Sequence, residues 1–126
     1  MSMTNPLARA RGHGSAKEGV QHWLAQRVTA VFLVFLLGWL VYALTALAGQ
    51  DHAAVKAFVA RPFNAALLIL LLLALLHHAV LGLQVVIEDY VHHPGTEMAL
   101  QFLIRAAAWL GMALGVVSVL KTALGA

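Results

Sequence analysis

The sequence predicts an all-α membrane protein whose three transmembrane helices run up and down across the bilayer. Of the 126 residues, 62% are apolar and only 10% are charged, whereas soluble domains average about 45–50% and about 25%. Three apolar stretches each approach the ~20 residues of a helical span. A helix satisfies every backbone polar group internally, as lipid requires. The composition excludes most soluble enzymes, nucleic-acid-binding proteins and disordered regulators.

The first span is expected over residues 28–48, between Arg27 and the polar sequence Gly49-Gln50-Asp51. Residues 1–27 then form a cytoplasmic N-terminal segment, and residues 28–126 form one three-helix anchor domain. The apolar run is longer than the 7–15 residues of a signal-peptide core and follows a long tail, so we do not expect cleavage after it.

The second span is expected over residues 65–87, with Pro62 suited to its first turn. The third covers residues 98–120, with Gln101 and Arg105 in its opening turns. Gly111 and Gly115 give this third helix a GxxxG surface for close helix contact. The first loop, residues 49–61, shows helical spacing of its apolar residues, which predicts a short interfacial helix.

The distribution of charge predicts the orientation of the chain. Residues 1–27 carry a net charge of +3, the first loop carries +1, and residues 88–97 carry −3. Acidic residues contribute little to topology, so the basic tail places the N-terminus in the cytoplasm. With three spans, the C-terminus is then periplasmic.

His77 and His78 lie near the centre of the second span, where an ionisable residue indicates a functional site. Adjacent helical residues point about 100° apart, so the two cannot ligate one face of the same metal. His78 shares a face with Gly82, which leaves room for a flat macrocycle. His78 is therefore either an axial ligand of a haem or a packing histidine that hydrogen-bonds a neighbouring helix. For His77 we favour an interhelical hydrogen bond, and its role stays open.

The second span ends at Glu88-Asp89-Tyr90. A phenol here suits hydrogen bonding to a bound carbonyl, with a carboxylate beside it to relay protons. The ordinary alternative is an interfacial aromatic belt with acidic residues at the helix end. Arg27 is suited either to pairing with an anionic group such as a haem propionate or to snorkelling toward headgroups. With no Cys and the other His in loops or tails, nothing indicates a zinc or iron–sulfur site.

The run from His78 to Val91 resembles the hydrophobic membrane anchor subunit of succinate dehydrogenase, the smaller b-type cytochrome chain of respiratory complex II. The shared pattern is a His, a Gly four residues later, and Asp-Tyr at eleven and twelve. The segment Gly19-Val20-Gln21-His22-Trp23, followed by Arg27, is similar to the residues before the family's first helix. Helix count, order and length also agree.

The resemblance implies that His78 is an axial ligand of haem b, shared with a second anchor chain in a heteromeric helical bundle. It implies that Tyr90 hydrogen-bonds ubiquinone, that Asp89 lies in the quinone pocket, and that Arg27 lies near the haem propionates. The partners would be a second cytochrome b anchor, an iron–sulfur subunit and a flavoprotein, in the bacterial inner membrane. Two alternatives remain: a haem-free membrane scaffold or assembly anchor, and a small proton-conducting protein.

Overall fold

A computed structural model of the chain describes residues 16–125, with side chains from residue 19 onward. The described chain contains four helices: α2 over Ala16–Leu47, α3 over His52–Ala60, α4 over Pro62–Tyr90 and α5 over Pro94–Ala123. No strand occurs within residues 16–125. Three helices are long and apolar enough to cross a membrane, as predicted. Most of the expected cytoplasmic segment, residues 1–15, lies outside the described residues.

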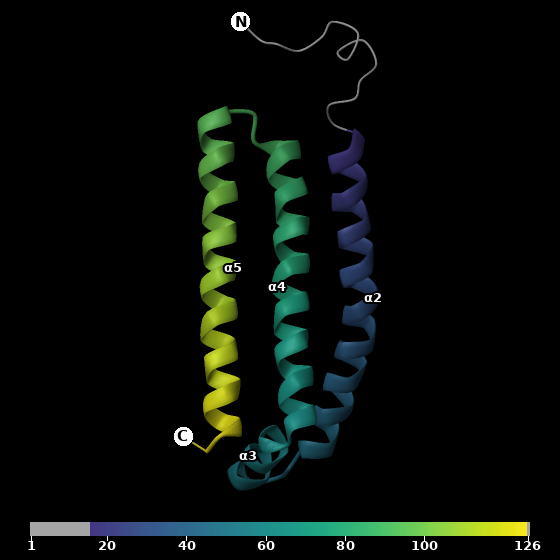
Figure 1. Cartoon of the computed structure of the whole chain (residues 1–126), viewed down its shortest axis with the longest axis vertical. Coiled ribbons are helices and arrows are strands. Elements are labelled where there is room, and N and C mark those ends of the chain that lie inside the picture. The colour runs from purple at the N-terminus through teal and green to yellow at the C-terminus, as the bar shows by residue number, and fades with distance from the viewer. Residues whose placement is uncertain (1–15, 126) are drawn as a thin grey trace, which may run out of the picture.

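The three long helices stand side by side in one layer, with α4 in the middle (Figure 1). α4 packs against both α2 and α5, and the short α3 crosses one end of the layer against α4 and α5. We call this end the α3 end. At the opposite end α2 begins, α4 finishes and α5 begins, and we call it the Tyr90 end. α4, with 29 residues, is about 43 Å long, more than the ~30 Å of bilayer hydrocarbon.

Apolar packing joins α2 to α4. Leu33 and Leu36 of α2 and Leu71 of α4 form the buried core cluster, flanked by Leu40, Leu67 and Ala74. The members of each helix recur three, four or seven residues apart, the spacing that places side chains on one face. This seam occupies the half of the layer nearer the α3 end and leaves the half nearer the Tyr90 end to polar residues.

Close approach of backbones joins α4 to α5. A methyl group added at Gly111 would meet Leu76, and one added at Gly115 would overlap Leu72. Both leucines lie on α4, so these two glycines admit leucine side chains that a larger residue would exclude. The GxxxG surface predicted from the sequence is therefore a contact within the chain.

Three specific contacts fix the α3 end. The side chain of Asp51 caps α3 by accepting a hydrogen bond from the Ala54 N–H (2.8 Å). The ring of Phe58 stacks on Trp39 of α2, with centroids 6.2 Å apart. The Asn64 amide donates to the Phe58 carbonyl (2.9 Å), which ties α3 to the first turn of α4. The short helix predicted in the first loop is confirmed.

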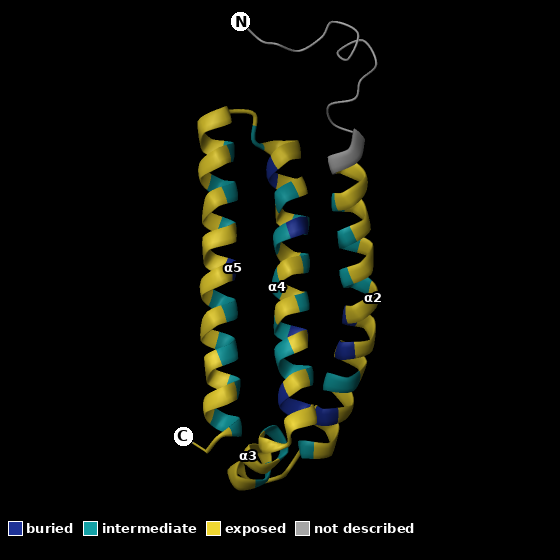
Figure 2. Ribbon diagram, in the orientation of Figure 1, coloured by how far each residue is buried: buried dark blue, intermediate teal, exposed yellow. Residues whose placement is uncertain are grey.

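The first long helix starts earlier than hydropathy predicts. α2 begins at Ala16, and residues 19–47 form its candidate span, whereas the apolar stretch begins at residue 28. The reason is that the polar residues of this extra length include Gln26 and His22, which turn toward α4 rather than outward. Figure 2 shows that the outer faces of all three long helices are exposed. These apolar faces require cover by lipid or by other chains.

Candidate functional site

His78 lies in the middle of α4 and faces α2. Its Nδ1 is 3.0 Å from the hydroxyl oxygen of Thr29, and its Nε2 is 3.4 Å from the side-chain nitrogen of Gln26. His78 is half-buried, as are both partners. His78 therefore makes an interhelical hydrogen bond.

Donor counting favours one tautomer of His78. The Thr29 hydroxyl donates its single hydrogen to the Ala25 carbonyl (2.8 Å), one turn back in its own helix. The same oxygen therefore accepts from His78, which places the imidazole proton on Nδ1. Nε2 is left with a lone pair, toward which the Gln26 amide points from a long distance. A neutral imidazole whose second nitrogen is held in this way is the form that binds a metal.

A groove of about 480 Å³ opens beside His78 at the seam between α2 and α4. Gly82, one turn beyond His78, forms part of its wall, and a methyl group added there would lie 3.6 Å from Gln26. Two buried polar atoms of the seam, Nε2 of His22 and Oε1 of Gln26, have no hydrogen-bond partner within the described chain. Buried polar atoms without partners are rare in finished structures. A ligand with polar groups in this groove would supply the missing partners.

These features fit a haem better than a metal ion bound by this chain. Residues 16–125 contain no group of three His, Cys, Asp or Glu side chains that could hold an ion. One imidazole would supply a single axial ligand through Nε2, and the missing side chain of Gly82 leaves space beside it. The second ligand of a six-coordinate iron would come from another polypeptide.

Arg27 lines the same groove. Its guanidinium carbon lies 5.6 Å from the centre of the Trp23 ring, within cation–π range. Arg27 is exposed, and within the described residues it forms no hydrogen bond to a side chain. Its N–H groups remain available to an anionic group at the edge of the groove.

Asp89 and Tyr90 lie in the last turn of α4, which ends at Tyr90 and is capped by Val91. Tyr90 is 78% exposed, and Asp89 is also exposed. Asp89 follows His78 by eleven residues and so shares its helix face. Neither residue lines the groove that contains Arg27. Within this chain, then, Arg27 lies with His78, and the Asp-Tyr pair lies apart at the Tyr90 end.

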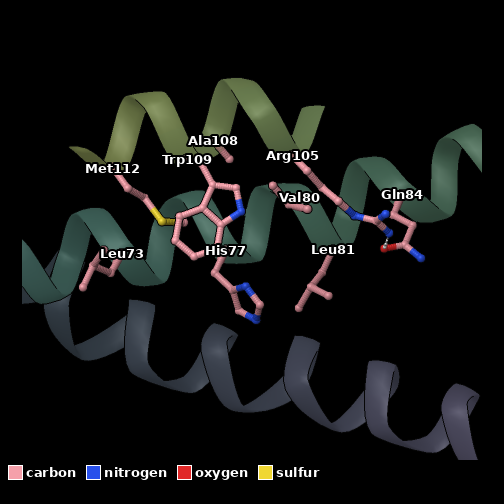
Figure 3. A pocket seen from close by; sticks show the side chains of 9 residues that line it. All are labelled: Leu73, His77, Val80, Leu81, Gln84, Arg105, Ala108, Trp109 and Met112. Atoms are coloured by element: carbon pink, nitrogen blue, oxygen red, sulfur yellow. Dashed lines mark hydrogen bonds between the residues drawn. The ribbon is translucent and has the colours of Figure 1, made fainter. Parts of the chain in front are cut away.

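His77 does not line the groove beside His78; it lines a second groove together with Trp109 and Met112 of α5, and Figure 3 shows its ring beside that of Trp109. Residues 19–125 provide no hydrogen bond to its ring, so the preference for an interhelical bond at His77 stays a prediction. His77 lies about 100° around the helix from His78, the residue that bonds to α2. Glu88, on the His77 side of α4, accepts a hydrogen bond from Gln84 (2.8 Å).

Sequence reasoning missed Gln26 and gave no function to Thr29 or His22. A signal for all three was present, because they stand four and three residues apart, the spacing of one helix face. A polar stripe on a helix that is otherwise apolar indicates a polar neighbour. Here that neighbour is His78.

Comparisons with known proteins show which family the sequence resembles. Residues 1–120 match the family described as the succinate dehydrogenase/fumarate reductase transmembrane subunit. The hydrophobic membrane anchor subunit of succinate dehydrogenase from Rickettsia bellii is 42% identical over 85 residues, 68% of each chain. The subunit of that name from Paracoccus denitrificans is 30% identical over 126 residues, 100% of this chain and 97% of its own. The membrane anchor subunit from Reclinomonas americana is 34% identical over 95 residues, 73% of this chain and 79% of its own.

Proposed function

Since the chain belongs to the succinate dehydrogenase/fumarate reductase transmembrane subunit family and serves as a membrane anchor of succinate dehydrogenase, we propose that it holds one side of a haem b through Nε2 of His78. The observation that carries this proposal is the Thr29–His78 hydrogen bond. It orients the ring of His78, so that the opposite nitrogen lies at the groove, 3.4 Å from the side-chain nitrogen of Gln26.

The surrounding residues have distinct tasks in this proposal. A bound haem b supplies one-electron chemistry between the iron–sulfur subunit and the quinone. Thr29 orients the His78 ring, and Gly82 keeps the groove open. Arg27 and Nε2 of His22 would hold the propionates of the cofactor, because their N–H groups can donate to a carboxylate.

Ubiquinone binds at the Tyr90 end. The exposed Tyr90 hydroxyl donates a hydrogen bond to a quinone carbonyl, and Asp89 beside it holds a proton for transfer. Tyr90 follows His78 by twelve residues, about 18 Å along the helix. Electrons therefore reach the quinone at the membrane surface, where protons are available from water.

The complex that uses this site contains a second cytochrome b anchor, an iron–sulfur subunit and a flavoprotein. The iron–sulfur clusters lie in another subunit, because this chain has no cysteine to hold one. The complex passes electrons from succinate oxidation in the tricarboxylic acid cycle to ubiquinone in the respiratory chain. The chain lies in the bacterial inner membrane with its N-terminus cytoplasmic and its C-terminus periplasmic. The net charge of +3 on residues 1–27 supports this orientation.

Adjacent histidines provide a matched test of haem ligation. In the purified complex, His78→Ala should abolish or strongly perturb the b-type absorption spectrum, whereas His77→Ala should leave axial ligation intact. The measurement is the reduced-minus-oxidised spectrum, normalised to the flavin content of the same preparation. An equal loss in both variants would contradict the assignment of His78.

A haem-free membrane anchor is the second candidate. The Thr29–His78 bond also favours this candidate, because a histidine that only joins α2 to α4 would make the same bond. The two candidates differ in what the purified wild-type complex contains. A complex that reduces quinone with succinate but shows no b-type spectrum would establish the haem-free anchor.

A further inference from the structure

We propose that the groove between α4 and α5 binds a phospholipid with a phosphoethanolamine headgroup, whose phosphate is held by Arg105. This groove lies on the other side of α4 from His78 and has a volume of about 570 Å³. Its wall is apolar except for His77, Gln84 and Arg105, and Figure 3 shows Arg105 reaching Gln84 at one end of it.

Arg105 is a charged residue at a depth where the hydrocarbon core of the bilayer makes a charge energetically costly. It follows Pro94, the first residue of α5, by eleven residues, about 16 Å along a helix that is about 45 Å long. With ~30 Å of hydrocarbon, its backbone lies well inside the membrane. The side chain extends back toward the Tyr90 end, to Gln84 on α4 and Gln101 one turn earlier on α5.

The bonds of Arg105 leave its charge uncompensated. One terminal nitrogen, Nη2, donates to Oε1 of Gln84 (3.3 Å) and to Oε1 of Gln101 (3.4 Å). Both acceptors are neutral amides. A guanidinium has five N–H donors, so three remain without a partner in the part of the chain that the structure describes. Free N–H donors on a cation at this depth call for an anionic acceptor, and the phosphate of a lipid is the anion of the membrane.

Carboxylates lie above this cation, nearer the Tyr90 end. Gln84 donates to Glu88 (2.8 Å), and Gln101 donates to Glu97 (3.3 Å). The order from the surface inward is therefore carboxylate, amide, guanidinium. A phosphoethanolamine headgroup has the complementary order, with its ammonium outermost and its phosphate beneath. This charge order favours it over an anionic glycerol headgroup, which would bring no cation to the carboxylates.

Two hollows meet at Arg105, a more polar one and an apolar one, which match the headgroup and the acyl chain of a lipid. The outer one, about 340 Å³, is lined by Glu97 and Gln101 among other residues of α5. The inner one runs from Arg105 to Met112 along an apolar wall that includes the exposed ring of Trp109. The headgroup occupies the outer hollow, and the first part of an acyl chain covers the inner one.

The groove faces away from the haem and quinone residues proposed above. At about 100° per residue, His77 lies about 100° to one side of His78, and Tyr90 lies about 120° to the other. A partner that covers the Tyr90 side of α4 therefore leaves this groove open to lipid. The inference is independent of haem ligation, because it uses none of those residues.

Lipid retention by the whole purified complex tests the proposal. Complexes exchanged into micelles that contain equal amounts of phosphatidylethanolamine and phosphatidylglycerol should retain one phosphatidylethanolamine per copy of this chain, counted by native mass spectrometry. Arg105→Gln should lose it, and Arg105→Lys should keep it. Lys121→Gln, which removes a positive charge at the other end of α5, is the control and should retain the lipid. Equal retention by Arg105→Gln and wild type would overturn the proposal, as would retention of phosphatidylglycerol or ubiquinone instead.

A second measurement on the unmodified complex guards against failed assembly of the variants. Phosphatidylethanolamine with a photoreactive acyl chain should label the α5 segment that contains Trp109 and Met112. Labelling spread evenly over the exposed faces of α2 and α5 would overturn the proposal, because it would show bulk lipid only.

Discussion

Replacing Thr29 by Val tests how the chain prepares His78 for iron. Valine keeps the shape and the β-branch of threonine but removes the oxygen that accepts the Nδ1–H of His78. The substitution leaves the imidazole proton without a partner and frees the ring to rotate. We expect the haem to remain bound, but more weakly and at a higher midpoint potential, because an imidazole without this acceptor is a poorer electron donor.

The structure sets the size of the effect. Leaving a buried donor unsatisfied costs about 1–3 kcal/mol, and His78 is half-buried, so we take about 1–2 kcal/mol. This corresponds to about 5–30-fold weaker cofactor retention. If the whole energy falls on the oxidised state, the midpoint potential rises by about 40–90 mV, at 59 mV per tenfold change for one electron.

The assay is a redox titration of the b-type absorption in the purified complex, together with haem content per flavin after dilution. Thr29→Ser restores the hydroxyl and should behave as wild type. Thr45→Val removes a hydroxyl of α2 that bonds only to the Tyr42 carbonyl in its own helix, and it should leave the potential unchanged. A Thr29→Val complex with unaltered potential and haem content would refute the role assigned to the Thr29–His78 bond.

Three further predictions concern space and hydrogen bonding. Gly82→Leu should remove the b-type spectrum without lowering the amount of chain in the membrane. The groove at Gly82 has room for a methyl group against Gln26 but not for both a leucine and a macrocycle. Unchanged absorption would contradict this prediction. Gly115→Val should weaken the packing of α5 on α4 by about 1–3 kcal/mol, since added atoms overlap Leu72, and the yield of assembled complex in mild detergent measures it. Tyr90→Phe should depress quinone reduction by succinate about 10-fold or more while assembly, measured by size-exclusion chromatography, stays normal; full activity would remove Tyr90 from the quinone site.

The fold class and the number of spans follow from the sequence because lipid leaves the backbone few choices. The start of α2 could not be read in the same way. Hydropathy treats Gln26 and His22 as residues that face water, whereas they face His78 across a helix seam. Their spacing carried the information, but only the position of α4 shows which face it describes.

For the site residues too, the sequence predicts which residues share a helix face but not which helix that face contacts. Periodicity on α4 correctly put His78 and Gly82 on one face and His77 on another. It could not say which neighbour each face would meet, because one sequence does not fix the order of helices in a layer. For that reason an interhelical bond was considered at both histidines, and within the described chain it is found at His78. The surroundings of Arg105 likewise became clear only from the position of Gln84 beside it.

Because the three long helices form a single layer, the middle helix α4 forms a wall of both grooves. If α4 turns about its long axis, the hollow at α2 and the hollow at α5 change shape together. A substitution that turns α4 would therefore change the surroundings of the imidazole at position 78 and of the guanidinium at position 105 together.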